Sequence, residues 1–356
     1  MTRRHWVLSL LLSGMGFAQD SFSGAPRIVA VGDVHGDYDA FVSVLRAAGV
    51  VNGSGKWTGA KTHLVQTGDV VDRGPDSRKV MDLLIELEKQ ARRAGGYVHS
   101  LMGNHEAMDV YGDLRYVSAA EYEAFRTKKS AELREEMMKR SLPEDTKPDD
   151  AYKKKWDAEH PLGWIEHRLA FGPEGKYGQW IRKKNVIVKV NDAIFLHGGI
   201  NPKFAAGTLK EMNERGRAEL KDFDKPNGGM LLNGGMIMDD DGPLWFRGLA
   251  QEPEEKLAAH LDQVLANFGV KRVVIGHTPQ PAVMPRFGGK VIVIDVGLSR
   301  VYGGPPACLV IEAGKTQALH RGKLIDLPSD SASLSLYLKT VAALEPPSSP
   351  VHKLLQ

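Results

Sequence analysis

Short apolar runs alternate with longer amphipathic segments over the first hundred residues. Three of these runs have the length and β-branched content of buried strands: residues 28–31, 63–67 and 97–102. Two segments between them, residues 37–48 and 75–94, carry apolar side chains at helical spacing. Asp37 is the expected N-cap of the first helix, and Gly95-Gly96 ends the second. Strands separated by helices favour an α/β fold with a parallel sheet.

The pattern changes to a charged, helix-rich stretch over residues 114–182. Residues 121–140 are dense in Lys and Glu, a break follows at 143–150, and a second helical piece lies around 152–160. We interpret the stretch as a helical insertion at the surface. Its charge is typical of a solvated helical face, and a binding patch is the alternative. Four aromatic residues are expected to pack onto the main domain: Trp156, Trp164, Phe171 and Trp180.

Strand-like patterns return after the insertion. Residues 186–190 and 193–196 are expected to be two strands joined by a hairpin-type turn at Asn191-Asp192. Four further runs also predict strands: residues 272–275, 290–294, 307–311 and 316–321. Together these elements predict one main domain over residues 27–327.

The C-terminal segment, residues 328–356, is rich in Ser and Pro. That composition is typical of a tail outside the main domain. One helix is expected over residues 334–344, and residues 346–356 are expected to be disordered.

The first eighteen residues resemble an export signal. Arg3 and Arg4 form a basic start, an apolar stretch follows, and Gly16-Phe17-Ala18 is a small-x-small cleavage site. The apolar stretch has 13 residues, too few to span a bilayer of about 30 Å. We therefore expect a cleaved signal peptide, an exported protein that is periplasmic or secreted, and no stable membrane association. The arginine pair fits either a twin-arginine signal or an ordinary basic start.

Composition excludes several other classes of protein. The 47 Lys and Arg residues against 44 Asp and Glu give a net charge of +3, which predicts no nucleic-acid partner. The single cysteine, Cys308, cannot form an intramolecular disulfide and is expected to be a small buried hydrophobe. Cysteine-dependent phosphatases place an arginine six positions after the nucleophile, whereas Gly314 occupies that position here.

Metal-ligand side chains follow five of the apolar runs directly, on glycine-flanked loops. The segments are Gly32-Asp33-Val34-His35-Gly36, Gly68-Asp69-Val70-Val71-Asp72-Arg73-Gly74, Gly103-Asn104-His105-Glu106, His197-Gly198-Gly199 and Gly276-His277-Thr278-Pro279. Each segment alone has an ordinary explanation as a helix cap, a turn or a surface histidine. Sites in parallel sheets form beyond the carboxyl ends of strands, so the joint occurrence predicts one shared metal site. Carboxylate, imidazole and amide donors suit Mn, Fe or Zn.

This set of motifs resembles the phosphoprotein phosphatase family of metallophosphoesterases, whose signatures GDxHG, GDxxDRG, GNHE, HGG and a late histidine are all present. The resemblance covers about residues 28–311, apart from much of the insertion. The segments Gly276-His277-Thr278-Pro279 and 241–248 point to the bacterial-type, Shewanella-like branch. So does Asp295-Val296-Gly297-Leu298-Ser299, which leads to Tyr302. The eukaryotic sequence before this tyrosine is missing, so no role is assigned to Tyr302.

The resemblance implies a calcineurin-like metallophosphoesterase fold, a β-sandwich of two mixed sheets flanked by helices, with the helical insertion. It also implies two divalent metal ions. Asp33 and His35 would bind one ion, and Asp69 would bridge both. The second ion would be held by Asn104, His197 and His277. A bridging carboxylate is physically reasonable because two adjacent dications repel, and a water between them loses a proton near neutral pH and can attack phosphorus in line.

Four further residues receive catalytic roles. His105 is the expected general acid that protonates the leaving group, and Asp72 would orient it. Arg73 and Arg247 suit the remaining phosphate oxygens, because a guanidinium offers a planar fork of donors. Glu106 is expected to be structural. Six histidines match no motif and are expected to be ordinary: His63, His99, His160, His167, His260 and His320.

We therefore expect a metal-dependent phosphomonoester hydrolase, with a phosphotyrosine or phosphoserine/threonine protein as its substrate. Hydrolysis of nucleotides or dinucleoside polyphosphates is the alternative, because symmetrical Ap4A hydrolases share these motifs. A metal-bound scaffold without catalysis is a minor alternative. The His105-Asp72 pair and both arginines argue against the scaffold, which would not need a general acid.

Overall fold

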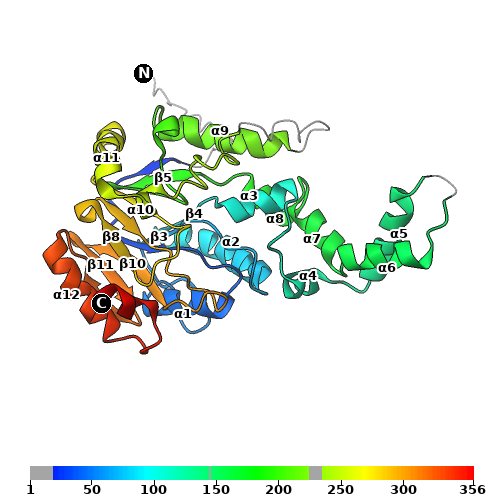
Figure 1. The fold of residues 1–356 in the computed structure, drawn as a ribbon, viewed down its shortest axis with the longest axis horizontal. Helices are drawn as coiled ribbons and strands as arrows, with labels where there is room; N and C mark the ends of the chain where they lie inside the picture. The colour runs from blue at the N-terminus through cyan, green and yellow to red at the C-terminus, as the bar shows by residue number, and fades with distance from the viewer. Residues whose placement is uncertain (1–18, 144–145, 224–234) are drawn as a thin grey trace, which may run out of the picture.

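The part of the chain that the structure describes is built around two six-stranded mixed sheets (Figure 1). The structure is a computed structural model that describes residues 19–143, 146–223 and 235–356. The predicted signal peptide of residues 1–18 lies outside the described residues. The predicted α/β fold with two mixed sheets flanked by helices is confirmed.

The first sheet contains the three N-terminal strands that were predicted. Its order is β12-β11-β10-β2-β3-β4. The strands are β2 (Arg27–Val31), β3 (His63–Gln66), β4 (Tyr97–Ser100), β10 (Ala307–Glu312), β11 (Lys315–His320) and β12 (Lys323–Asp326). The neighbours β2, β3 and β4 are parallel, with Ala30 beside Val65 and Val65 beside His99. Their carboxyl ends therefore meet at one edge of the sheet.

The second sheet has the order β1-β5-β6-β7-β9-β8. Its strands are β1 (Ser21–Phe22), β5 (Ile187–Val190), β6 (Ala193–Leu196), β7 (Arg272–Ile275), β8 (Met284–Arg286) and β9 (Val291–Val293). The predicted hairpin is present: β5 and β6 are antiparallel, and Asn191 in the turn has a φ of 54°. The strands β6, β7 and β9 are parallel, so this sheet also brings three carboxyl ends together.

Helices join these strands and flank the sheets. They include α1 (Tyr38–Ala47), α2 (Ser77–Arg93), α3 (Asn104–Tyr111), α9 (Leu209–Asp222), α10 (Gly248–Gln251) and α11 (Glu254–Phe268), with short 3₁₀ helices at Pro202–Phe204 and Phe287–Gly289. The Asp37 side chain accepts the Ala40 N–H at the start of α1, as predicted for an N-cap. Within the described residues, no helix combines the length and apolarity that a membrane crossing requires.

The described part of residues 114–182 contains five helices, where the pattern predicted a helix-rich stretch with pieces over 121–140 and around 152–160. These are α4 (Ala119–Phe125), α5 (Ser130–Ser141), α6 (Asp150–Glu159), α7 (Trp164–Phe171) and α8 (Lys176–Ile181). Figure 1 shows α5 and α6 farthest from the sheets, while α8 lies close to α2 and α3. Phe171 is fully buried, and the Trp180 indole donates a hydrogen bond to Glu88 on α2. The inner helices α7 and α8 therefore pack onto the main fold.

The expectation that residues 346–356 are disordered is wrong. Residues Pro350–Leu355 form a 3₁₀ helix, η4, that packs on α12 (Ser331–Ala342), and Val351 is buried. The α12 helix is anchored in turn, because the Tyr337 hydroxyl donates a 2.7 Å hydrogen bond to the Val283 carbonyl. The Ser- and Pro-rich composition concealed this packing, which depends on a few apolar side chains.

Because α12 is packed on the fold, its buried side chains should contribute measurably to the free energy of unfolding. Val341 is 0% exposed, whereas Leu336 on the same helix is 68% exposed. Val341→Ala should lower the free energy of unfolding by about 1.5–3 kcal/mol, because it removes two buried methyl groups and leaves a cavity. Leu336→Ala should change it by less than about 0.5 kcal/mol. Denaturant unfolding measures both, and equal small effects would show that α12 is not docked.

Candidate metal centre and phosphate site

The site lies where the carboxyl ends of six parallel strands from both sheets meet. In the first sheet, β2 is followed by Asp33 and His35, β3 by Asp69, and β4 by Asn104 and His105. In the second sheet, β6, β7 and β9 are followed by His197, His277 and Asp295. All of these side chains are buried. The structure thus brings together every predicted metal ligand, as the strand-end rule for parallel sheets requires.

Several site residues adopt left-handed backbone conformations that non-glycine residues rarely adopt. The φ angles are 45° at His35, 57° at Asp69, 67° at Asp72, 64° at Arg73 and 66° at His277. Each such residue costs on the order of 1 kcal/mol or more, and the surrounding contacts must compensate. These turns aim the side chains from tight loops into one small volume.

Glu106 provides part of that compensation. Its carboxylate accepts three backbone N–H groups, from Asp69 at 2.8 Å, Val70 at 2.7 Å and Gly103 at 2.8 Å. These bonds hold the strained loop after β3 against the first turn of α3. The structure therefore gives Glu106 a supporting place, in agreement with the structural role expected for it.

Two glycines allow the metal loops to approach closely. A Cβ atom on Gly103 would lie 2.3 Å from Asp69 Oδ1, and one on Gly276 would lie 2.6 Å from Asp33 Oδ1. Both distances are far inside van der Waals contact. The glycines beside Asn104 and His277 are thus required because carboxylates of other loops occupy the space where their side chains would be.

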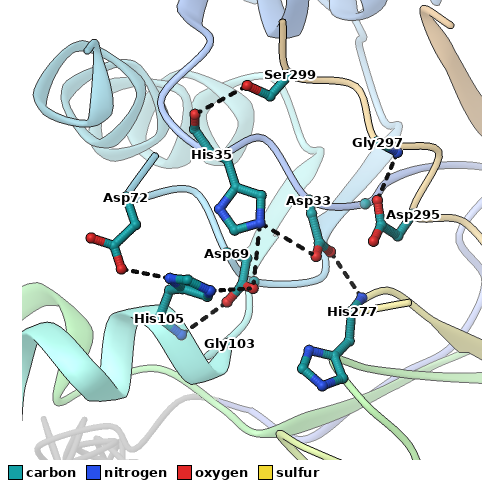
Figure 2. Close-up of polar contacts among 12 residues, drawn as sticks. Asp33, His35, Asp69, Asp72, Gly103, His105, His277, Asp295, Gly297 and Ser299 are labelled. Atoms are coloured by element: carbon teal, nitrogen blue, oxygen red, sulfur yellow. Dashed lines mark hydrogen bonds and ion pairs between the residues drawn. The ribbon is translucent and has the colours of Figure 1, made fainter. Parts of the chain in front are cut away.

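The Asp69 carboxylate lies at the centre of the donor atoms (Figure 2). Its Oδ2 is 3.3 Å from His197 Nε2 and 3.8 Å from both His35 Nε2 and His105 Nε2. His277 joins Asp69 and His197 in a second group whose candidate ligand atoms lie within 4.8 Å of one another. The central place of Asp69 is consistent with the bridging role that the sequence resemblance implied, and that role stays a prediction.

Asp33 and Asn104 extend the donor set on either side of Asp69. Asp33 Oδ2 is 3.9 Å from His35 Nε2, and its Oδ1 accepts the backbone N–H of His277 at 3.0 Å. Asn104 Oδ1 is 2.9 Å from His197 Nε2. Asp33 therefore lies beside His35 but also contacts the loop of His277, and Asn104 lies beside His197, so the predicted division of these ligands between two ions stays a prediction.

Backbone carbonyls fix which ring nitrogen of each ligand histidine is available to a metal. A carbonyl only accepts, so the nitrogen that contacts it must carry the proton. The bonds are His35 Nδ1 to Val71 at 3.1 Å, His197 Nδ1 to Thr67 at 3.0 Å and His277 Nε2 to Trp245 at 3.1 Å. The opposite nitrogens are left with a free lone pair. Such carbonyl partners are typical of metal-binding histidines.

The charges of these groups also fit divalent cations. Burial lowers the pKa of His35 to about 3 and that of His277 to about 2, so both imidazoles are in the neutral form that binds metal. Burial opposes ionisation of Asp69, but His197 and His105 hold its pKa well below the usual range. Burial and the neighbouring Asp295 raise the pKa of Asp33. A bound cation would offset the repulsion between these carboxylates.

His105 and Asp72 form a hydrogen-bonded pair beside the donor set. His105 Nδ1 is 2.5 Å from Asp72 Oδ2, and its Nε2 faces Asp69 (Figure 2). Burial opposes the charge on His105, but Asp69 and Asp72 outweigh it and raise the pKa of His105. Burial raises the pKa of Asp72 to about 6. His105 Nε2 can therefore present a proton to a ligand in the site, which matches its predicted place.

The two predicted arginines flank the site. Arg73 stacks between aromatic rings, with its guanidinium carbon 4.4 Å from the Tyr116 ring centroid and 5.4 Å from that of Tyr302. Arg247 donates to the His277 carbonyl at 2.5 Å and to Thr278 Oγ1 at 3.2 Å. These contacts hold both guanidinium groups next to metal-ligand loops.

Three site residues were not assigned a role from the sequence. Asp295 follows β9, so the strand-end rule that found the other ligands could have found it. The Tyr302 ring lies 5.5 Å from the His35 ring, and Tyr302 is 41% exposed. Tyr116 comes from the insertion, and its backbone carbonyl accepts the Arg73 N–H at 2.9 Å. No local spacing signals the place of Tyr116, because it depends on how the insertion packs.

The sequence of this chain is similar to those of known phosphoesterases and phosphatases. Residues 26–281 match the family model described as calcineurin-like phosphoesterase. Shewanella-like protein phosphatase 2 of Arabidopsis thaliana is 32% identical over 292 residues, 79% of this chain and 74% of that protein. An uncharacterised protein of Schizosaccharomyces pombe is 35% identical over 315 residues, 85% of this chain and 83% of that protein.

A solved structure shows the same likeness. The cold-active protein-tyrosine phosphatase of a psychrophilic Shewanella species superimposes with a TM-score of 0.67 at 31% identity. The superposition covers 87% of this chain and 82% of that one. The likeness therefore extends over most of both chains.

The central place of Asp69 predicts how metal content depends on each ligand. Relative to the wild type, Asp69→Asn should lose two bound divalent ions, because it weakens both positions at once. Asn104→Ala should lose one ion. The exposed Asp39→Asn on α1 is the matched control and should lose none. Elemental analysis after dialysis measures these differences, and full metal retention in Asp69→Asn would contradict the bridging position.

Proposed function

The chain belongs to the calcineurin-like phosphoesterase family, and on that premise we propose that it is a metal-dependent protein phosphatase acting on phosphotyrosine or phosphoserine and phosphothreonine. The observation that carries this proposal is the joint placement of a dinuclear O/N donor set, the His105-Asp72 pair and two arginines. A relative named as a protein phosphatase and a solved structure named as a protein-tyrosine phosphatase support the choice of substrate.

The donor residues would hold two divalent ions in the predicted arrangement. Asp33 and His35 would bind the first ion, and Asp69 would contact both. Asn104, His197 and His277 would bind the second. When bound, such ions supply a water that loses its proton near neutral pH and polarise the phosphate oxygens. The oxygen and nitrogen donors fit manganese, iron or zinc, and the proposal leaves the choice among them to elemental analysis.

The arginines would bind the phosphate oxygens that face away from the metal ligands. Arg73 is held by stacking rather than by an ion pair, and its buried Nε has no hydrogen-bond partner among the described residues. Its donors therefore remain available to a bound phosphate. Arg247 is held beside the His277 loop by its bonds to the His277 carbonyl and Thr278 Oγ1. Two guanidinium forks would fix the phosphate for attack from one face.

His105 would complete the reaction by giving its Nε2 proton to the leaving oxygen. Asp72 fixes the ring through Nδ1, so Nε2 is the nitrogen directed into the site. The raised pKa of His105 keeps the proton on the ring to higher pH than in an isolated histidine. An alkoxide such as that of serine is a poor leaving group, so proton donation would matter most for that substrate.

A cysteine nucleophile is incompatible with the structure. Cys308 is fully buried in β10, and burial raises the pKa of its thiol to about 12. A thiol of that pKa is not ionised at neutral pH, and the thiolate is the reactive form. Hydrolysis of phosphotyrosine by this chain would therefore use the metal-ligand site rather than a thiolate.

A substrate panel tests the proposed function. Metal-reconstituted protein should hydrolyse a phosphotyrosine or phosphoserine peptide with a higher kcat/KM than diadenosine tetraphosphate. Cys308→Ser should retain that activity. Cleavage of the dinucleotide alone would support the alternative of a nucleotide hydrolase. Metal-loaded protein that turns over no substrate in the panel would overturn the enzymatic role.

The role of His105 predicts a dependence on the leaving group. His105→Asn should lower kcat by about 10² to 10⁴ for phosphoserine, the usual range for general acid catalysis. The loss should be much smaller for p-nitrophenyl phosphate, because that leaving group departs as a stable anion. Steady-state kinetics on both substrates, with metal content measured in parallel, checks this. An equal loss on both substrates at full metal content would refute the acid assignment.

The pH dependence of activity in Asp72→Asn tests the His105-Asp72 pair separately from the loss of His105. Asp72 helps to raise the pKa of His105. Protonated His105 therefore persists to a higher pH than an ordinary histidine, and it is lost as the pH rises through the raised pKa. Removing the carboxylate should move the basic limb of the phosphoserine profile to lower pH. An unchanged basic limb would show that the limb does not report His105.

A further inference from the structure

A second buried cluster of metal-ligand side chains lies outside the site described above. Asp109 comes from α3, Glu121 from α4 and His167 from α7, and each of the three is 0% exposed. His167 Nε2 is 3.9 Å from Asp109 Oδ2 and 3.7 Å from Glu121 Oε1. One ligand atom from each residue lies within 4.8 Å of the other two.

The polar atoms of this cluster have no hydrogen-bond partners among the described residues. This holds for both carboxylate oxygens of Asp109, both of Glu121 and both ring nitrogens of His167. Buried polar atoms in proteins nearly always have a partner. The neighbouring Arg168 does not supply one, because its guanidinium donates to the Asp109 backbone carbonyl instead. Three fully buried side chains therefore face one another outside hydrogen-bond geometry, and the Ser77 hydroxyl and the Asp72 backbone N–H also lie near Glu121 and lower its pKa.

The separations are those of ligands around one ion rather than of a hydrogen-bonded network. A hydrogen bond between these groups would need about 2.5–3.2 Å. Metal bonds of about 2.0–2.2 Å in a tetrahedral arrangement place the ligand atoms about 3.3–3.6 Å apart, within a few tenths of an ångström of those seen between His167 and the carboxylates. Burial also raises the pKa of Glu121 to about 8 and that of Asp109, so a cation would stabilise both as anions.

The ring of His167 is held in the orientation that a ligand would need. It stacks on Phe171 at 4.4 Å with an interplanar angle of 25°, and Phe125 and Tyr122 meet it edge to face at 5.0 and 5.5 Å. These aromatic contacts fix the plane of the imidazole without using either nitrogen. A preorganised imidazole between two carboxylates is a donor set of the kind that binds Zn²⁺ or Mn²⁺.

We propose that Asp109, Glu121 and His167 bind a third divalent ion. The ion would join α4 and α7 of the insertion to α3. That helix begins with Asn104 and His105, and Asp109 is about one turn further along it, so the ion would anchor the helix that presents a metal ligand and the expected general acid. Its function would be structural, because the cluster is closed to solvent.

Metal content of matched variants tests the proposal. His167→Phe keeps an aromatic ring in the stack and removes both nitrogens, and Glu121→Gln keeps the size and removes the charge. Each should bind one divalent ion fewer than the wild type after equilibration with Mn²⁺ or Zn²⁺ and dialysis. His160→Phe is the control, because His160 lies in the same insertion and its Nδ1 already bonds the Trp156 carbonyl. It should bind as many ions as the wild type.

Anomalous diffraction from wild-type crystals grown with the same ion gives a test that does not depend on how the variants fold. The expected result is a peak between Asp109, Glu121 and His167, separate from those at the main site. Peaks at the main site with none at the cluster would overturn the proposal. So would equal metal content in His167→Phe and wild type. Because these readouts count ions, they are independent of whether the chain acts on phosphoproteins.

Discussion

The buried carboxylate of Asp69 is the contact on which the arrangement of the site depends. It lies between His35, His105 and His197, which come from loops of both sheets. An anion at this point would attract cations held by the surrounding histidines and would separate two cations that otherwise repel each other. Bound ions would therefore join the carboxyl ends of the two sheets by electrostatics, in addition to the hydrophobic core.

The cost of this arrangement appears in the backbone, and the compensation comes from neighbouring groups. Left-handed conformations at His35, Asp69 and His277 are unfavourable for non-glycine residues. The three N–H groups accepted by Glu106 and the close approach allowed by Gly103 stabilise the loop at Asp69. Among the described residues, five of the ten non-glycine residues with a positive φ stand at positions predicted to bind metal or to act in catalysis, as is typical of strain held at a functional site. The rest of each strand is regular.

The ligand loops could be predicted from the sequence because each one is local: an apolar strand, a glycine and a polar side chain follow one another in the chain. The helices α1 and α2 were predicted for the same reason, whereas α9 and α11 were not predicted. The cluster of Asp109, Glu121 and His167 could not be, since it depends on how three helices of different segments pack. The C-terminal helix was predicted, but its docking was not, because Tyr337 and Val341 hold it through contacts distant in sequence, within a composition typical of disorder.

The central claim is that a phosphate bound beside Asp69 is hydrolysed in a single in-line displacement, with no covalent intermediate on the protein. The most direct measurement is the stereochemical course at phosphorus, using a phosphorothioate monoester made chiral with two oxygen isotopes and hydrolysed in water that carries the third. One displacement inverts the configuration, so the account predicts inversion. Net retention would require two displacements through a phosphorylated residue, and would contradict the account.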